Sequence, residues 1–134
     1  MEIEIDAAKH GVGKTVLVAD DNAAIRKMIA GAFLSDGFKT CGEAENGREA
    51  ISLAREVQPD LITLDLSMPV MNGLDAAVEL RKIFPKTPII LFTLFGDGLL
   101  PSEAARAGVT LVLSKTTPLA HLIVLAHRLL RKKD

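Results

Sequence analysis

This 134-residue sequence has one cysteine, a small net charge and no long apolar run. The one cysteine, Cys41, has no second cysteine with which to form an internal disulfide bond, and this favours a reducing, cytoplasmic location. A formal net charge of -1 argues against a domain that binds nucleic acid or a membrane surface through bulk charge. No apolar run reaches the roughly 18 residues that a membrane span requires.

The start of the chain differs from the remainder. Residues 1–14 are mixed and acidic, and they lack the basic start and apolar stretch of a secretory signal. We interpret them as a leader and residues 15–134 as a single domain, which suits their number. Residues 11–15 partly match a nucleotide-binding P-loop, but Ala8 stands where that motif requires glycine. The segment also precedes a strand, whereas a P-loop follows one, so we reject that interpretation.

Four short apolar runs, each ended by polar residues, predict strands that are covered on both faces. These runs are residues 16–19, 61–64, 88–92 and 109–113. Residues 39–44 are more polar and contain Gly42, so they predict a fifth strand at an edge of the sheet.

Apolar residues at helical spacing fill the intervals between these strands. Asn22 can cap the first helix and Gly37 lies just past its end. Asn46 can cap the second. We expect the first helix to bury one stripe formed by Ile25, Met28, Ile29, Ala32 and Phe33. Further helices are predicted after Gly73, over the short segment 102–107, and from about Pro118 onwards.

Strands and helices therefore alternate five times, which predicts an α/β fold: a doubly wound, five-stranded parallel sheet with helices on both faces. The flavodoxin-like strand order 2-1-3-4-5 places the polar second strand at an edge. In such a sheet, ligands bind outside the carboxyl ends of the strands, where the strand order reverses. Here that point lies between the first and third strands.

Five polar residues follow strands at this edge: Asp20, Asp21, Asp65, Thr93 and Lys115. Three carboxylates in one crevice repel each other and must bind protons or cations, and Mg2+ prefers such oxygen ligands. The Lys115 ammonium and the Thr93 hydroxyl suit an anion. Any one of these residues taken alone is better explained as a cap or turn residue. Together they predict aspartyl-phosphate chemistry.

These residues resemble those of a bacterial response-regulator receiver domain, and the resemblance runs from about Thr15 to the last helix. The motifs that carry it are Asp20-Asp21, the segment Asp65-Leu66-Ser67-Met68-Pro69 with Asn72-Gly73, Thr93 and Lys115.

The resemblance implies that Asp65 accepts a phosphoryl group from a sensor histidine kinase or phosphotransfer protein. Asp21, Asp65 and the backbone carbonyl of Ser67 would bind Mg2+, with Asp20 acting mainly through water. Lys115 would contact a phosphoryl oxygen, and Thr93 would swing inward to report phosphorylation. The chain would then switch its contacts with an effector or output domain, without turnover of a separate substrate.

Several positions depart from the family pattern, among them Leu94, which follows Thr93 where a small residue is common. Two other departures bear directly on the proposed switch and on the lysine. Val112 stands where the family often has an aromatic switch residue, and the chain has no Tyr or Trp, which argues against the usual coupling of Thr93 to an aromatic ring. Thr116 follows the lysine where many receivers have proline with a cis peptide bond. A cis bond here would carry the non-proline cost of roughly 2.5–4 kcal/mol.

Other functions remain as alternatives. One is a pseudo-receiver that docks without phosphorylation. Another is a phosphatase with an Asp nucleophile, but such enzymes commonly have a second Asp where this chain has Ser67. A flavodoxin is disfavoured because Asp20 and Asp21 would repel the flavin phosphate.

The last helix has more apolar residues than one buried stripe needs, among them Val124 and Leu125. Scattered surface apolar residues explain this as well as a partner surface does. The second alternative fits the family's habit of forming homodimers through the last two helices. We interpret His121 and His127 as surface residues, and we expect no direct binding of nucleic acid or membrane.

Overall fold

The computed structural model describes residues 13–94 and 98–131, with no side-chain description for Cys41. The strands are β1 (Thr15–Ala19), β2 (Lys39–Ala44), β3 (Leu61–Leu64), β4 (Ile89–Thr93) and β5 (Leu111–Ser114). The helices are α2 (Ala23–Ser35), α3 (Gly47–Val57), α4 (Gly73–Ile83), α5 (Pro101–Arg106) and α6 (Leu119–Arg131). Most of the predicted leader lies outside the described residues.

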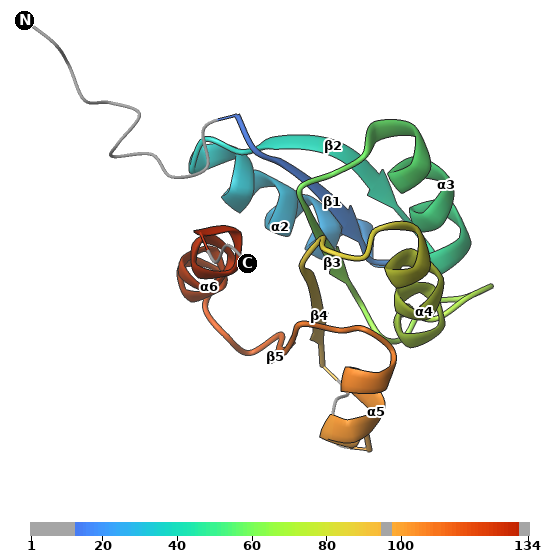
Figure 1. Cartoon of the computed structure of the whole chain (residues 1–134). Helices are drawn as coiled ribbons and strands as arrows, with labels where there is room; N and C mark the ends of the chain where they lie inside the picture. Colours follow the sequence, from blue (N-terminus) through green and yellow to red (C-terminus); the bar gives the residue numbers. More distant parts are fainter. Residues whose placement is uncertain (1–12, 95–97, 132–134) are drawn as a thin grey trace, which may run out of the picture.

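The strands form one parallel sheet in the order β2-β1-β3-β4-β5, which confirms the predicted topology (Figure 1). Helices α2 and α6 cover one face of this sheet, and α3 and α4 cover the other, with α5 beside them at the β5 end (Figure 1). Among the described helices, none is both long enough and apolar enough to cross a membrane.

Alternate residues of the central strands point into two separate cores, as the period of a strand requires. Val16 and Val18 of β1 pack with Phe33 under α2 and α6. Leu17 packs with Leu80 on the side of α3 and α4. Strands β1, β3 and β4 are buried on both faces, and this holds the polar residues at their carboxyl ends in fixed positions.

Each of the first three described helices starts at an asparagine that follows a strand. The side chains of Asn22, Asn46 and Asn72 accept hydrogen bonds from backbone N–H groups three residues on, at 3.0, 2.8 and 2.8 Å. The first two caps were predicted from sequence. A capped start lets α2 begin two residues after Asp21, and it lets α4 begin at Gly73, close in space to the Asp65 backbone.

The predicted stripe on α2 is wrong in part, because Met28 is 60% exposed. The helix instead buries Arg26, Ile29, Ala30 and Phe33. These residues keep the spacing of a single stripe, but one of them is charged. A search for apolar residues alone therefore places the stripe slightly off its true position.

The prediction that the last strand is covered on both faces is also wrong. Strand β5 begins two residues later than expected, and its residues alternate between half-buried and exposed, with Val112 40% exposed. It lies at an edge of the sheet, and the short α5 leaves part of its face open. An apolar run thus does not distinguish a central strand from an edge strand.

His127 is buried, which corrects its interpretation as a surface residue. Its ring stacks on Phe38 with centroids 5.4 Å apart, and its Nε2 atom pairs with an Asp36 carboxylate oxygen. These two contacts of His127 hold α6 against the turn that follows α2. His121 is exposed, as predicted.

Thr63 of β3 has a buried hydroxyl that makes no hydrogen bond within the described part of the chain. Its register neighbours are Val18 and Ile90. We expect Thr63→Val to raise the free energy of unfolding by about 1 kcal/mol, because it removes an unsatisfied polar group without a change of shape. Thermal unfolding followed by circular dichroism measures this.

Thr110→Val is the matched control for Thr63→Val. The Thr110 hydroxyl accepts a hydrogen bond from the Ile89 backbone at 3.0 Å, so its loss should lower stability. A Thr63→Val protein less stable than the unaltered chain would contradict the expectation.

Candidate functional site

The carboxyl ends of β1 and β3 lie side by side, and each is followed by an aspartate. Ala19 pairs with Leu64 in the sheet register. The Asp65 backbone N–H donates to the Ala19 carbonyl at 2.9 Å, and that of Asp20 donates to the Ala44 carbonyl at 2.9 Å. The backbone hydrogen bonds between neighbouring strands thus continue as far as Asp20 and Asp65 and fix the backbones of these two residues.

Three carboxylates meet at this edge. Asp20, Asp21 and Asp65 each offer an oxygen, and these oxygens lie within 4.8 Å of one another. Asp20 is 1% exposed and Asp65 is 6% exposed, whereas Asp21 is open to solvent. The cluster therefore has a buried floor and one accessible side, where Asp21 stands.

Lys115 brings a positive charge to the cluster from the far end of the sheet. Its Nζ atom pairs with an Asp20 carboxylate oxygen and lies 3.4 Å from Asp65 Oδ1. The Lys115 backbone N–H donates to the carbonyl of Thr93 at 3.0 Å, which places the start of this loop beside the end of β4. The lysine side chain is itself buried.

Thr93 ends β4 and is buried, and its side chain lies near enough to Asp65 to lower the pKa of that carboxyl group. Ser67 lies two residues beyond Asp65, and its side chain is exposed. The structure therefore joins five of the predicted site residues by direct contacts or short distances, and Ser67 lies on the adjoining loop.

Burial raises the pKa of Asp65 above its ordinary value of 3.8, and the negative charge of Asp20 raises it further. Lys115 and Thr93 act in the opposite direction on this pKa but do not cancel the rise. The ionised form of Asp65 is thus held in an environment that disfavours it. The carboxylate oxygens of Asp20, Asp21 and Asp65 are hard ligands, and such ligands suit a small divalent cation such as Mg2+.

Two features that support the site were not assigned that role from sequence. The Asn22 backbone N–H donates to Asp20 Oδ1 at 2.9 Å, in addition to the capping role of its side chain. Gly73 lets α4 approach the Asp65 backbone, since a Cβ atom there would lie 2.2 Å from the Asp65 carbonyl oxygen. Its place within the Asn72-Gly73 motif is the signal that could have revealed the second feature.

Comparison with known proteins identifies the family. The family model described as the response regulator receiver domain matches residues 16–127. The chain belongs to this family. Receiver domains are the signalling switches of two-component systems, and the predicted family, fold and signalling class are confirmed.

Curated relatives of the receiver domain include chemotaxis and transcriptional regulators. The chain is 42% identical to the chemotaxis protein CheY of Thermotoga maritima over 97 residues, which are 72% of this chain and 81% of that protein. It is 37% identical to the transcriptional regulatory protein PdtaR of Mycobacterium tuberculosis over 118 residues, or 87% of this chain and 56% of that one.

Solved structures share the fold of this receiver domain. The receiver domain of AraT from Geobacillus stearothermophilus has a TM-score of 0.77 and 32% identity, covering 87% of this chain and 92% of that one. The CheX-CheY-BeF3-Mg2+ complex from Borrelia burgdorferi has a TM-score of 0.87 over 93% of this chain and 99% of that chain. Its 22% identity supports the fold alone.

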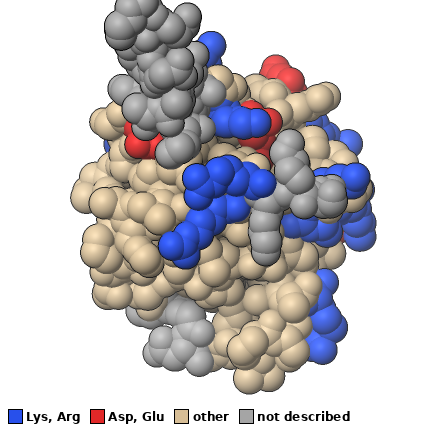
Figure 2. All heavy atoms as spheres, turned by 60° about the vertical axis from the view of Figure 1, so that its left-hand side comes forward, with Lys and Arg blue, Asp and Glu red and all other residues tan. Residues whose placement is uncertain are grey.

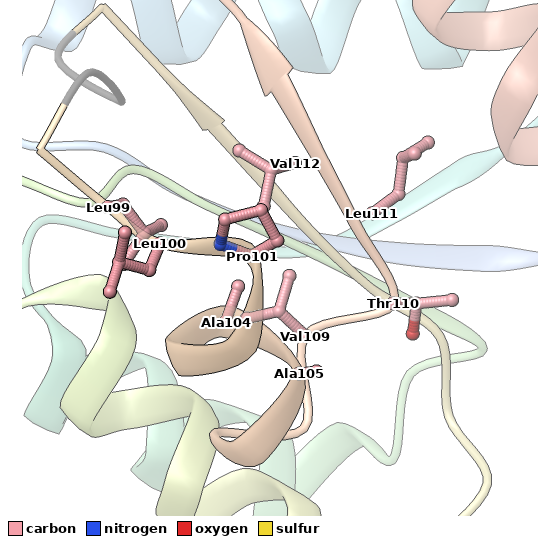
Figure 3. A pocket seen from close by; sticks show the side chains of 9 residues that line it. All are labelled: Leu99, Leu100, Pro101, Ala104, Ala105, Val109, Thr110, Leu111 and Val112. Atoms are coloured by element: carbon pink, nitrogen blue, oxygen red, sulfur yellow. The ribbon is translucent and has the colours of Figure 1, made fainter.

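Two departures of this receiver from its family have visible consequences. Val112 projects from β5 toward a hollow of about 370 Å³ that Pro101, Ala104 and Val109 also line, while Leu111 points from the other face of the strand (Figure 3). The peptide bond between Lys115 and Thr116 is trans. The lysine thus reaches the carboxylates without a cis bond.

Gly73→Ala should lower the free energy of unfolding by about 1–3 kcal/mol, because the new methyl group would meet the Asp65 carbonyl oxygen and α4 would have to move. Urea unfolding followed by circular dichroism measures this change. Gly31→Ala on α2 is the control, since nothing lies within 4 Å of a Cβ atom there. That variant should gain about 0.5–1 kcal/mol from helix propensity. Equal effects at both positions would contradict the close approach at Gly73.

Asp65→Asn should raise the melting temperature in metal-free buffer at pH 7. Since the folded pKa of Asp65 lies above its unfolded value, this group's stabilising contribution is complete below pH 3.8 and is lost as the pH rises through the folded pKa. The neutral variant avoids that loss, so its advantage should shrink as the pH falls toward 4. Thermal unfolding across this pH range measures it.

Glu56→Gln, which removes an exposed carboxylate on α3, is the control for Asp65→Asn. It should change the free energy of unfolding by less than about 0.5 kcal/mol at any pH in the range. An Asp65→Asn protein that melts below the unaltered chain at pH 7 would show that the ionised carboxylate stabilises the fold.

Proposed function

We propose that this receiver accepts a phosphoryl group on the carboxylate of Asp65, with Mg2+ bound beside it, and that phosphorylation switches its contacts with other proteins. One observation carries the proposal: Asp65 lies within a cluster of three carboxylates and 3.4 Å from the Lys115 ammonium. A phosphoryl group on Asp65 would bring more negative charge to this edge, and the site provides both a cation and oxygen ligands for a second cation.

In the proposed reaction, an Asp65 carboxylate oxygen attacks phosphorus, and the bond from phosphorus to the nitrogen of a donor phosphohistidine breaks. Lys115 is placed to stabilise the negative charge that spreads over the phosphoryl oxygens. Asp21, Asp65 and the Ser67 carbonyl would hold Mg2+, with Asp20 acting through water. When bound, Mg2+ would neutralise phosphoryl charge.

Thr93 is the proposed reporter of phosphorylation. Its side chain already interacts with Asp65, and its strand neighbour in register is Ser114 of β5. A new oxygen acceptor on Asp65 would compete for the Thr93 hydroxyl. Because β5 is an edge strand, a change at Thr93 reaches the surface within one strand.

The surface formed by α5, β5 and α6 is the proposed contact region for a homodimer or an effector. Val112 and Val124 are exposed on it, and Figure 3 shows the hollow beside Val112. Figure 2 turns the α6 side forward and shows Lys and Arg side chains across the middle of the view, with a largely uncharged area below them. Exposed apolar side chains suit a protein partner better than nucleic acid.

The donor and the output belong to the proposal as well. Receiver domains act with histidine kinases and output domains, and the chain spans 56% of PdtaR and 25% of the regulatory protein AtoC of Escherichia coli. We propose that this receiver works in the cytoplasm, that its phosphoryl donor is a sensor histidine kinase or phosphotransfer protein, and that it turns over no separate substrate. The single cysteine supports the location, and the family supports the donor.

Beryllofluoride with Mg2+ tests phosphoacceptor function, because it mimics a phosphoryl group on a carboxylate. Amide spectra of the full chain should show saturable shifts around Asp65 and Thr93, which depend on Mg2+. Asp65→Asn should abolish them. Shifts that persist in Asp65→Asn would contradict the assignment of Asp65 as acceptor.

The same preparation separates the remaining alternatives. A spectrum unchanged by beryllofluoride, in a chain that still binds a kinase, would indicate a docking module without phosphorylation. Release of phosphate from many small phosphoesters would indicate a phosphatase. Transfer from a panel of phosphorylated sensor kinases would identify the donor.

A further inference from the structure

Arg26 is a buried charge that the proposed chemistry does not use. It lies on the inner stripe of α2 and is only 8% exposed. Arginine is almost never fully buried without partners, because its guanidinium group cannot lose its proton at ordinary pH. The contacts of Arg26 should therefore explain why a cation occupies this position.

Both ends of the guanidinium group reach acceptors close to the acidic cluster. Its Nη1 atom donates to the backbone carbonyl of Asp20 at 2.8 Å. Its Nε atom donates to Glu43 Oε1 of β2 at 3.1 Å. Arg26 thus joins α2, the end of β1 and the edge strand through one planar group.

The carbonyl that Arg26 binds is part of the peptide unit between Asp20 and Asp21. On its other sides, Asp20 is already fixed by the Ala44 carbonyl, the Asn22 N–H and Lys115. The hydrogen bond from Arg26 adds the remaining constraint, on the plane of the peptide that leads to Asp21. That plane sets the direction in which the exposed Asp21 side chain leaves the backbone.

Arg26 also differs from Lys115 because it leaves the carboxylate oxygens of the cluster unoccupied. Lys115 pairs with carboxylate oxygens of the cluster, whereas Arg26 donates hydrogen bonds to a backbone carbonyl and to Glu43. These hydrogen bonds occupy none of the carboxylate oxygens of the cluster. These oxygens remain available to a divalent cation.

We propose that Arg26 is a positioning residue for the acidic cluster. It orients the peptide between Asp20 and Asp21 so that the Asp21 carboxylate faces the cation, and it touches neither the cation nor the phosphoryl group. The cation-binding part of this inference rests on the proposed function. The orientation of the peptide can be tested without metal.

The first test uses metal-free protein and the pair Arg26→Met and Lys27→Met. Lys27 is adjacent on α2, is 68% exposed and also approaches Glu43 Oε1, at 3.4 Å, but forms no hydrogen bond with the Asp20 carbonyl in the structure. Both variants remove one positive charge. The amide nitrogen shift of Asp21, which reports the hydrogen bond to the preceding carbonyl, should move in Arg26→Met and stay in place in Lys27→Met.

The second test measures Mg2+ affinity by calorimetry, since the chain has no Trp or Tyr to serve as an intrinsic fluorescent probe. Arg26→Met should weaken Mg2+ binding by about 10–100-fold, the range for loss of a residue that orients a metal ligand. Lys27→Met should stay within about twofold. Arg26→Lys, which keeps the charge but not the planar fork, should show an intermediate affinity and replaces Arg26→Met if the latter does not fold.

The outcomes separate this inference from the proposed function. Failure of the unaltered chain to bind Mg2+ would overturn the metal part of the proposed function, while the Asp21 shift would still decide the role of Arg26. An unchanged Asp21 shift in folded Arg26→Met or Arg26→Lys would overturn the positioning role. So would equal losses of Mg2+ affinity in Arg26→Met and Lys27→Met, because they would show that only the charge matters.

Discussion

Repulsion between like charges at one edge of the sheet is the constraint that organises the site. Asp20, Asp21 and Asp65 bring carboxylate oxygens within 4.8 Å of one another because β1 and β3 are neighbours and end together. Lys115 offsets part of this repulsion, but burial and Asp20 still raise the pKa of Asp65. The folded chain therefore holds an arrangement that a cation stabilises, and this makes the edge responsive to ligands.

The central strands and the edge strand β5 differ in how far they are buried. Strands β1, β3 and β4 are buried on both faces and carry the carboxylates and Thr93. Strand β5 is half-exposed and borders the hollow beside Val112 (Figure 3). Thr93 pairs in register with Ser114, so the site directly adjoins this half-exposed edge strand.

Much of the fold could be predicted because local patterns and tertiary structure agree. Apolar runs identified β1, β3 and β4, and Asn22 and Asn46 cap the helices they were expected to cap. The errors on the helices share a cause. Arg26 is buried although it is charged, and so is His127, because each pairs with a residue of another part of the chain. Spacing along a helix gives the width of its buried stripe but not the polar groups that neighbouring elements offer to it.

The sequence by itself determined the order of strands and helices, the family, and which polar residues follow which strands, because these depend on residue types at short spacing. Only the tertiary structure decided that β5 is half-covered, that Lys115 pairs with Asp20 as well as lying near Asp65, and that Gly73 packs on the Asp65 backbone. It also decided that Arg26 binds the carbonyl between the paired aspartates. Such contacts depend on the depth and angle at which elements pack, and hydrophobic patterning constrains these only loosely.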